Sequence, residues 1–269
     1  MDYDKYLRLD KFPHIWCAGC GDGIVLKSML RAIDNLGLQK DEIAMVSGIG
    51  CSSRTTGYVD FNTLHTTHGR PITFATGLKM ARSDLTVIVV TGDGDATAIG
   101  GNHLIHAARR NINLTVVIYN NNIYGMTGGQ ASPTTPLGHF ATTAPFGNLE
   151  NAFNISGLAI AAGASFVARS TVFHANFLSN LLEKAIQKKG FSLVEVMSPC
   201  PVAYGKLNKL GSGAKMIMDQ KYQTVKASKA ETMSEEELEG KIVIGVLVDR
   251  ELPEYVTTYE KVVEQAMQR

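Results

Sequence analysis

The strongest constraint on the fold of this chain is a series of apolar segments that alternate with helical patterns. Four segments are almost continuously apolar, at 43–48, 85–92, 114–120 and 191–197. Between them, apolar residues recur at helical spacing, at 26–36, 71–82, 98–110, 158–162 and 177–186. A strand that reads as an uninterrupted apolar run is buried on both faces, which is typical of a parallel sheet between two helical layers. The pattern therefore predicts an α/β fold with a mostly parallel sheet covered by helices on both faces.

Composition narrows the class of protein further. Hydrophobic residues make up 45% of the 269 residues and charged residues 19%, which excludes a disordered chain. The net charge of +1 gives no reason to expect nucleic acid or an anionic membrane as a partner. No apolar run reaches the roughly 18 residues that span a bilayer, and residues 1–14 lack the apolar core of a signal peptide. We expect a cytoplasmic protein that binds no membrane.

Charge is distributed unevenly along the chain, and this suggests two parts. Residues 201–269 hold 10 Lys/Arg and 11 Asp/Glu, whereas the first 200 residues hold few charges for their length. We take 1–200 as the α/β domain that carries the site. Residues 201–269, with a strand at 241–248 and a terminal helix, form a C-terminal extension that packs on this domain or on a partner subunit. Residues 1–200 have few charges either because they form a large core or because part of their surface packs against another subunit.

Two polar motifs follow two of the predicted strands at the point where each strand ends. GDGD occupies 92–95 and NNN occupies 120–122, with 25 residues between Gly94 and Asn120. Because the carboxyl ends of parallel strands meet at one edge of the sheet, both motifs should lie where α/β folds bind ligands. GDGD alone would indicate a solvated turn, but the pair at this spacing is typical of a thiamine diphosphate site.

The residue types in these motifs suit a magnesium ion that bridges two phosphates. Mg²⁺ prefers oxygen ligands, and Asp93 offers a carboxylate, Asn121 a side-chain carbonyl and Ile123 a backbone carbonyl. Glycine lets the backbone approach the phosphates, and a helix that begins after Asp95 would favour an anion at its N-terminus. Among the three asparagines, Asn121 matches the paired-Asn pattern best and stands two residues before Ile123.

The cysteines of the chain form a second pattern, and they are Cys17, Cys20, Cys51 and Cys200. The first two make a Cys-x-x-Cys, and the other two follow predicted strands at the same sheet edge. Buried thiols, a four-thiolate zinc site and an iron–sulfur cluster all fit this pattern, whereas disulfides do not suit a cytoplasmic chain. Thiamine chemistry favours the cluster, because the product of decarboxylation can be oxidised one electron at a time and zinc transfers no electrons.

Several motifs resemble the β subunits of the 2-oxoacid:ferredoxin oxidoreductases, and the resemblance covers almost the whole chain. They are WCAGCGDG, GIGCSS, HTTHGRPITFATGLK, GDGDATAIGGNH, YNNNIYGMTGGQ and SPCP. The family implies a thiamine-diphosphate-binding fold with three cofactors in this subunit: thiamine diphosphate, Mg²⁺ and one 4Fe-4S cluster. It also implies a reversible reaction in which a 2-oxo acid, coenzyme A and oxidised ferredoxin give acyl-CoA, CO₂ and reduced ferredoxin.

The resemblance also implies roles for individual residues. The cluster ligands are Cys17, Cys20, Cys51 and Cys200, and the magnesium ligands are Asp93, Asn121 and the Ile123 carbonyl. The cofactor-lining positions are Cys51, Ser52, His68, Gly94, Asp95, Asn121, Tyr124, Gly125, Met126 and Thr127. Two residues are catalytic candidates, since Arg54 matches a basic residue that binds the substrate carboxylate and His68 matches a histidine near the reacting carbon. Without the resemblance, Arg54 would be a solvated loop residue, His68 a satisfied polar residue and Met126 part of the core.

A partner subunit is the next implication. Thiamine enzymes need a Glu that protonates the aminopyrimidine ring, and in this family the α subunit supplies it from a pyrimidine-binding domain. The sequence contains no second α/β domain that could do so. We therefore expect a subunit that is inactive alone and works in an αβ or (αβ)₂ assembly, with ferredoxin as its electron acceptor.

The C-terminal extension bears on the substrate. Residues 201–269 resemble the corresponding part of 2-oxoglutarate enzymes, so 2-oxoglutarate is the expected 2-oxo acid, ahead of pyruvate or a branched 2-oxo acid. The competing classes are a non-redox thiamine decarboxylase subunit and a zinc-stabilised binding module with a degenerate cofactor site. A brown protein would favour the oxidoreductase, whereas a colourless protein that contains zinc would favour the binding module.

Overall fold

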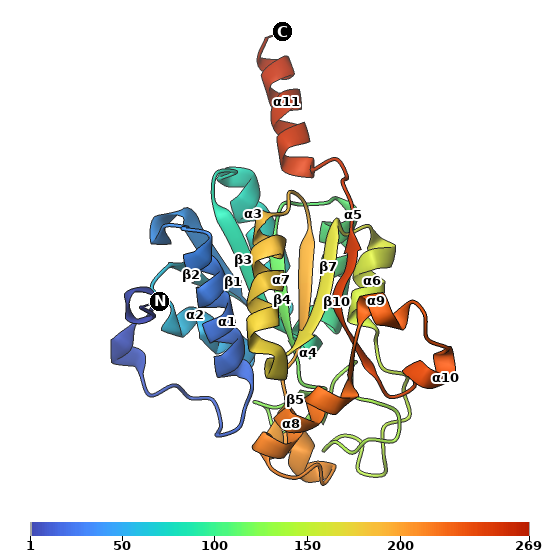
Figure 1. Cartoon of the computed structure of the whole chain (residues 1–269). Helices are drawn as coiled ribbons and strands as arrows, with labels where there is room; N and C mark the ends of the chain where they lie inside the picture. The colour runs from blue at the N-terminus through green and yellow to red at the C-terminus, as the bar shows by residue number, and fades with distance from the viewer. Residues whose placement is uncertain (1, 269) are drawn as a thin grey trace.

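A single sheet forms the centre of the protein, whose computed structural model describes residues 2–268. Its strands are β1 Ile43–Ser47, β2 Asn62–His65, β3 Thr86–Gly92, β4 Thr115–Asn120, β7 Phe166–Thr171, β8 Ser192–Met197, β9 Thr224–Lys226 and β10 Ile242–Asp249. They lie side by side in the order β2-β1-β3-β4-β8-β7-β10-β9 (Figure 1). Every neighbouring pair is parallel except β7 and β10. The predicted mostly parallel sheet is confirmed.

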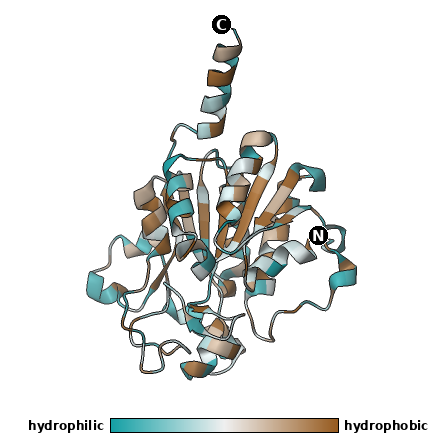
Figure 2. Cartoon of the chain, turned by 180° about the vertical axis from the view of Figure 1, so that it is seen from behind, coloured by the Kyte–Doolittle hydropathy of each residue, from teal (hydrophilic) through white to brown (hydrophobic). Residues whose placement is uncertain are grey.

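Helices cover both faces of this sheet (Figures 1 and 2). The helices are α1 Asp22–Asn35, α2 Thr55–Tyr58, α3 Pro71–Ala81, α4 Asp93–Thr97, α5 Gly101–Arg109, α6 Ile155–Ala162, α7 Ala175–Gln187, α8 Gly213–Gln223, α9 Ala227–Ala230, α10 Glu235–Leu238 and α11 Tyr255–Met267. Helices α1 and α7 pack into one hydrophobic core, and α3, α5 and α6 pack into the other. Strand β3 shows why its sequence is continuously apolar, since Ile88 faces the first core and Val89 the second.

The helix predicted at 98–110 is present as α5, which is three residues shorter at its start and one residue shorter at its end, and a separate short helix, α4, precedes it. Helix α4 starts at Asp93, so the expectation of a helix that begins after Asp95 is wrong. The helix breaks at Ala98, whose ψ is −100°, and α5 begins at Gly101. A side chain at Gly100 would lie 2.3 Å from the Asp95 carbonyl oxygen, so glycine is needed where the chain folds back on α4. The break places Asp93 in the first turn of a short helix directly at the sheet edge.

Two further short strands, β5 Ile123–Tyr124 and β6 Gln130–Ala131, form a separate hairpin after β4. The C-terminal residues extend the main sheet through β9 and β10, and the predicted strand at 241–248 is confirmed. Helix α8 lies at the carboxyl ends of the parallel strands, whereas α11 projects from the opposite end (Figure 1). None of the helices in the described part of the chain combines the length and apolarity needed to span a bilayer.

Candidate cofactor site

A cavity of about 500 Å³ opens at the carboxyl edge of the sheet, between the loops that follow β1, β3 and β4. Small-molecule sites typically have volumes of about 300–1,000 Å³. All ten residues predicted to line the cofactor lie around this one cavity, although they come from distant parts of the sequence. The lining residues are Ile49, Gly50, Cys51, Ser52, His68, Gly92, Asp93, Gly94, Asp95, Tyr119, Asn121, Ile123, Tyr124, Gly125, Met126, Thr127 and Gln130.

Asp93 is the buried carboxylate of this cavity, with only 2% of its surface exposed. The Ser132 hydroxyl donates a hydrogen bond to its Oδ2 atom at 2.6 Å, and the Thr134 hydroxyl donates to the same atom. Burial raises the pKa of the Asp93 carboxyl, and these two hydrogen bonds oppose the increase. No lysine, arginine or histidine within residues 2–268 forms an ion pair with it. Because a buried carboxylate without a cation is costly, this donor set fits a divalent cation.

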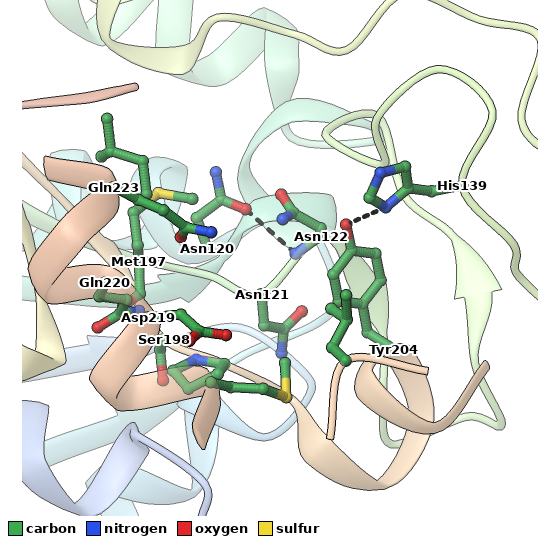
Figure 3. A pocket seen from close by; sticks show the side chains of 14 residues that line it. Asn120, Asn121, Asn122, His139, Met197, Ser198, Tyr204, Asp219, Gln220 and Gln223 are labelled. Atoms are coloured by element: carbon green, nitrogen blue, oxygen red, sulfur yellow. Dashed lines mark hydrogen bonds between the residues drawn. The ribbon is translucent and has the colours of Figure 1, made fainter. Parts of the chain in front are cut away.

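The three consecutive asparagines point in different directions. Asn121 alone lines the cofactor cavity, and its Oδ1 atom accepts a hydrogen bond from the Ile123 amide at 3.2 Å. Asn120 faces the sheet, where it donates to Glu195 at 2.8 Å. Its own Oδ1 accepts from the Asn122 amide at 3.2 Å, which closes the turn, as Figure 3 shows. Of the three asparagines, Asn121 is therefore the one that lines the cavity together with Asp93 and Ile123.

Asp95 lines the cavity, but the protein itself occupies both of its oxygens. Oδ2 accepts a hydrogen bond from the Thr91 hydroxyl at 2.5 Å, and Oδ1 accepts from the Gly69 amide at 2.6 Å. Nδ1 of His68 lies 2.7 Å from the same Oδ1 atom. The His68 ring also contacts the Tyr124 ring edge-to-face, with 6.0 Å between the centroids. Asp95 therefore holds the His68 loop against β3, which fixes the position of His68 over the cavity.

The cysteines gather beside the cofactor cavity. Cys51 lines it directly, and a side chain at Gly125 would lie 3.2 Å from the Cys200 sulfur, so Cys200 is next to its wall. Burial, together with the nearby Asp22, Cys200 and Cys17, raises the pKa of the Cys51 thiol to about 12. Burial, then Asp22, Cys51 and Cys200, likewise raise the pKa of Cys20. All four sulfurs are free thiols, and among residues 2–268 no three His, Cys, Asp or Glu side chains are placed to hold a single metal ion.

Asp22 is a residue of this region that the sequence patterns did not single out. It lies in the first turn of α1, two residues after Cys20, and is 1% exposed. The Ser198 hydroxyl donates to its Oδ1 atom at 2.7 Å, whereas Oδ2 has no hydrogen-bond partner. Burial raises the pKa of Asp22 to about 6, although the Ser198 hydrogen bond opposes the increase. The only sequence signal for it was its place directly after the Cys-x-x-Cys.

Arg54 stands at the rim of the cavity rather than inside it. Its side chain is exposed, and its Nη2 atom lies 3.8 Å from the Met126 sulfur. Met126, which is itself 39% exposed, lines the cofactor cavity. The structure thus brings Arg54 next to the predicted substrate pocket and leaves its guanidinium free to contact a ligand there.

Comparison with known proteins assigns the chain to a family. The model of the thiamine pyrophosphate enzyme C-terminal TPP-binding domain matches residues 48–196. The chain is 55% identical over 261 residues to the 2-oxoglutarate synthase subunit KorB of Methanocaldococcus jannaschii, and the alignment covers 97% of each. The chain belongs to the KorB family.

Two further relatives agree with this result. The KorB subunit of Methanothermobacter marburgensis is 56% identical over 252 residues, which cover 94% of this chain and 88% of that one. The 2-oxoglutarate:ferredoxin oxidoreductase from Magnetococcus marinus, solved with 2-oxoglutarate, coenzyme A and succinyl-CoA bound, matches with a TM-score of 0.89 at 34% identity. That match covers 99% of this chain and 91% of the other. The predicted thiamine-diphosphate-binding fold and the predicted oxidoreductase family are therefore confirmed for this chain.

Proposed function

We propose that this chain is the thiamine-binding subunit of an enzyme that oxidises 2-oxoglutarate. One 2-oxoglutarate, one coenzyme A and two oxidised ferredoxins give succinyl-CoA, CO₂, a proton and two reduced ferredoxins. The bond between C1 and C2 breaks, CO₂ leaves, and the remaining acyl carbon forms a thioester after it loses two electrons. The observation that carries the proposal is a single cavity in which the buried Asp93, Asn121 and Cys51 meet.

The first part of the proposal concerns the diphosphate end of the cavity. Asp93, Asn121 and the Ile123 carbonyl would hold Mg²⁺, whose charge would offset that of the cofactor's diphosphate. Thiamine diphosphate, when bound, supplies the nucleophile that attacks the 2-oxo group and the electron sink for loss of CO₂. Ser132 and Thr134 orient the Asp93 carboxylate toward the ion, as outer hydrogen bonds do at other metal sites. His68, fixed by Asp95, holds or moves a proton at the reacting end.

The second part concerns the electron path. Cys17, Cys20, Cys51 and Cys200 hold one 4Fe-4S cluster, which supplies one-electron transfer to ferredoxin. A cluster distributes its thiolates over different irons, so these sulfurs need not converge on one point. Cys51 itself lines the cofactor cavity, so a cluster held by these cysteines would lie beside that cavity. Burial raises the pKa values of Cys20 and Cys51, and cysteine ligands release their protons when a metal binds.

The third part concerns a partner. No Asp, Glu, Lys or Arg occurs between Arg110 and Glu150, and apolar side chains of this stretch and its end are exposed: Leu137, Phe140, Phe146, Leu149 and Phe153. Interface cores are depleted of charge and rich in aromatic residues. The same loop holds Asp93 through Ser132, so a protein that covers it also reaches the cofactor cavity. We assign this surface to the α subunit, which supplies the catalytic Glu in an αβ or (αβ)₂ assembly.

The two parts of the chain have different roles in this proposal. Residues 1–200 carry all the cofactor ligands, and residues 201–269 pack on this domain as an extension. Gln220 of α8 illustrates the packing, since it donates to the Met197 carbonyl at 3.0 Å at the end of β8. We place the enzyme in the cytoplasm, where reduced ferredoxin and free thiols are maintained.

The test of this function uses the αβ complex purified without oxygen. We expect 2-oxoglutarate to reduce ferredoxin in a reaction that requires coenzyme A and forms one succinyl-CoA for each CO₂. Pyruvate serves as the comparison substrate. CO₂ release without ferredoxin reduction would mean a non-redox decarboxylase, and colourless protein with stoichiometric zinc would mean a zinc-stabilised module.

The exposed loop gives a prediction about assembly. Phe146→Glu and Leu149→Glu should each weaken binding of the α subunit by at least about 30-fold, because anchor residues at interfaces contribute about 2 kcal/mol or more. Their side chains are 97% and 90% exposed, so the fold of the chain alone should be unaffected. Sedimentation and circular dichroism measure the two properties.

Met267→Glu is the matched control, since this side chain is 83% exposed on α11 at the opposite end of the molecule. Unchanged affinity in both loop variants would remove this surface from the proposed interface.

Arg54 gives a prediction about substrate binding. Arg54→Leu should raise the KM for the 2-oxo acid by about tenfold, because a charge-assisted hydrogen bond contributes about 1.5 kcal/mol. The KM for coenzyme A should change much less. Steady-state kinetics of the αβ complex with 2-oxoglutarate and pyruvate measures the effect.

An increase for both acids would place the 1-carboxylate at Arg54, and an increase for 2-oxoglutarate alone would place the distal carboxylate there. If neither KM changes, Arg54 is a solvated rim residue.

A further inference from the structure

A second cavity is lined by residues of the same loop after β1 that borders the cofactor cavity, and its walls carry positive charge. It has a volume of about 260 Å³ and is lined by Arg8, Ser53, Arg54, Thr56, Gly57, Thr63 and His65. The lining includes two arginines, a histidine and three hydroxyls, but no carboxylate. The net charge of the whole chain is only +1, so two arginines around one small cavity are a local feature.

The two arginines of this cavity have no acidic partner in the described part of the chain. Arg8 donates only to neutral acceptors: the Thr56 carbonyl at 3.4 Å, the Phe61 carbonyl at 3.3 Å and the Thr63 hydroxyl at 3.1 Å. Among residues 2–268, the Met126 sulfur is the one hydrogen-bond partner of the Arg54 side chain. Guanidinium groups bind oxyanions in a fork geometry that neutral acceptors do not satisfy.

Nearby carboxylates do not neutralise Arg8. Asp10 and Asp60 are close enough for the charge of Arg8 to lower their pKa values, but each is paired with a lysine. Lys11 lies 2.8 Å from Asp10, and Lys40 lies 2.5 Å from Asp60. The positive charge of Arg8 therefore remains available to a ligand in the cavity.

Ser53 provides an independent sign of a ligand. Its side chain is fully buried, and its hydroxyl has no hydrogen-bond partner within residues 2–268. Its backbone is fixed, because the Ser53 carbonyl accepts hydrogen bonds from Ser47 at 3.1 Å and Thr56 at 3.0 Å. Buried hydroxyls are almost always paired, so an unpaired one that lines a cationic cavity indicates a missing acceptor.

The arrangement is also rigid. The N-terminal segment is anchored beside α2, since the Arg8 amide donates to the Tyr58 carbonyl at 2.9 Å and the Asp60 amide donates to the Tyr6 carbonyl at 2.8 Å. His65 lies in β2, and its Nδ1 atom is 3.2 Å from the Ser47 hydroxyl, which leaves Nε2 for a ligand. These contacts hold the cationic side chains in place before any ligand arrives.

We propose that this cavity, termed here the Arg8 cavity, binds an oxyanion group of a reactant, with Arg8 and Arg54 as charge partners and the Ser53 hydroxyl as a buried donor. The proposal rests on the proposed function for its reactants. Ser52 lines the cofactor cavity and Ser53, the next residue, lines the Arg8 cavity, so a reactant of the first cavity that carries a remote anionic group is the kind of ligand to test. The distal carboxylate of 2-oxoglutarate and a phosphate of coenzyme A share this chemistry.

The direct test measures binding of inorganic phosphate to the full chain by calorimetry. Arg8→Gln and Ser53→Ala should each weaken phosphate binding, by about tenfold for the loss of a charged donor. Arg82→Gln is the matched control, because Arg82 is exposed and paired with Asp84 at 2.7 Å away from both cavities. If both cavity variants bind phosphate as tightly as the wild-type chain does, the proposed site is wrong.

Kinetics of the αβ complex then identifies the reactant. In Arg8→Gln, a higher KM for 2-oxoglutarate alone assigns the site to the distal carboxylate, and a higher KM for coenzyme A alone assigns it to a phosphate. If phosphate binds but neither KM changes, the cavity holds an adventitious ion only and the proposal fails. The proposed function is judged separately, by whether the wild-type complex oxidises 2-oxoglutarate at all.

Discussion

Asp93→Ala should abolish retention of thiamine diphosphate while the chain still folds. The carboxylate is the only anionic ligand proposed for Mg²⁺, and its two hydroxyl partners cannot replace it. Loss of an outer hydrogen-bonding residue at a metal site typically costs 10- to 100-fold in metal affinity, so loss of the ligand itself should exceed about 100-fold. Fluorescence of the released, oxidised cofactor measures occupancy after gel filtration in Mg²⁺.

Asp93→Ala should not destabilise the cofactor-free chain, although it abolishes cofactor binding. Burial raises the pKa of Asp93, so the folded chain binds this proton more tightly than the unfolded chain does. Above the raised pKa the ionised carboxylate therefore reduces the free energy of unfolding. Asp93→Ala removes this penalty, so at neutral pH the variant should unfold at an equal or higher temperature. Thermal unfolding without Mg²⁺ measures this.

Two further variants, one with a smaller expected effect and one control, strengthen the test of Asp93. Thr134→Val removes one hydrogen bond to the carboxylate and should weaken Mg²⁺-dependent cofactor binding by about tenfold. Asp84→Ala, an exposed residue paired with Arg82, should leave binding unchanged. Full cofactor occupancy in Asp93→Ala would contradict the metal assignment.

The predictable part of the fold is its buried sheet. Strands buried on both faces are apolar at most positions, so β1, β3, β4 and β8 are visible as almost uninterrupted apolar runs. Strand β2 was missed because it is an edge strand, with Asn62, Leu64 and His65 exposed. The break between α4 and α5 was missed because it depends on how closely Gly100 approaches Asp95 in space, which spacing along the sequence does not reveal.

The candidate site likewise contains residues that the sequence predicts and residues that it does not. Asp93, Asn121 and Cys51 could be predicted because each follows a strand end, and parallel strands bring such positions together. Ser132 and Thr134 could not, since they reach Asp93 from a loop about 40 residues later, a contact that no local pattern specifies. Asp22 and Arg8 were missed for a related reason. The role of a single carboxylate or guanidinium depends on the groups around it in space, and no local sequence pattern specifies those groups.

Cys200→Ala should remove the iron–sulfur cluster and stop electron transfer to ferredoxin, while the cofactor cavity survives. Cys200 follows β8 between two prolines, which stiffen the backbone and hold the sulfur beside Gly125. A four-thiolate cluster that loses one thiolate is lost or degraded. We expect a nearly colourless chain with little iron or sulfide and no ferredoxin reduction by the αβ complex.

Thiamine diphosphate should still bind to the Cys200→Ala chain, because Asp93 and Asn121 lie on other loops and make no hydrogen bond to Cys200. Retained cofactor with lost iron separates a missing cluster from a misfolded chain. Val202→Ala is the matched control, since Val202 is two residues away and 58% exposed. Cys200→Ser offers a weaker ligand and should keep part of the iron with an altered electron paramagnetic resonance spectrum. Wild-type iron content and reduction rate in Cys200→Ala would instead make Cys200 a structural thiol, and the electron path would then need a different ligand set.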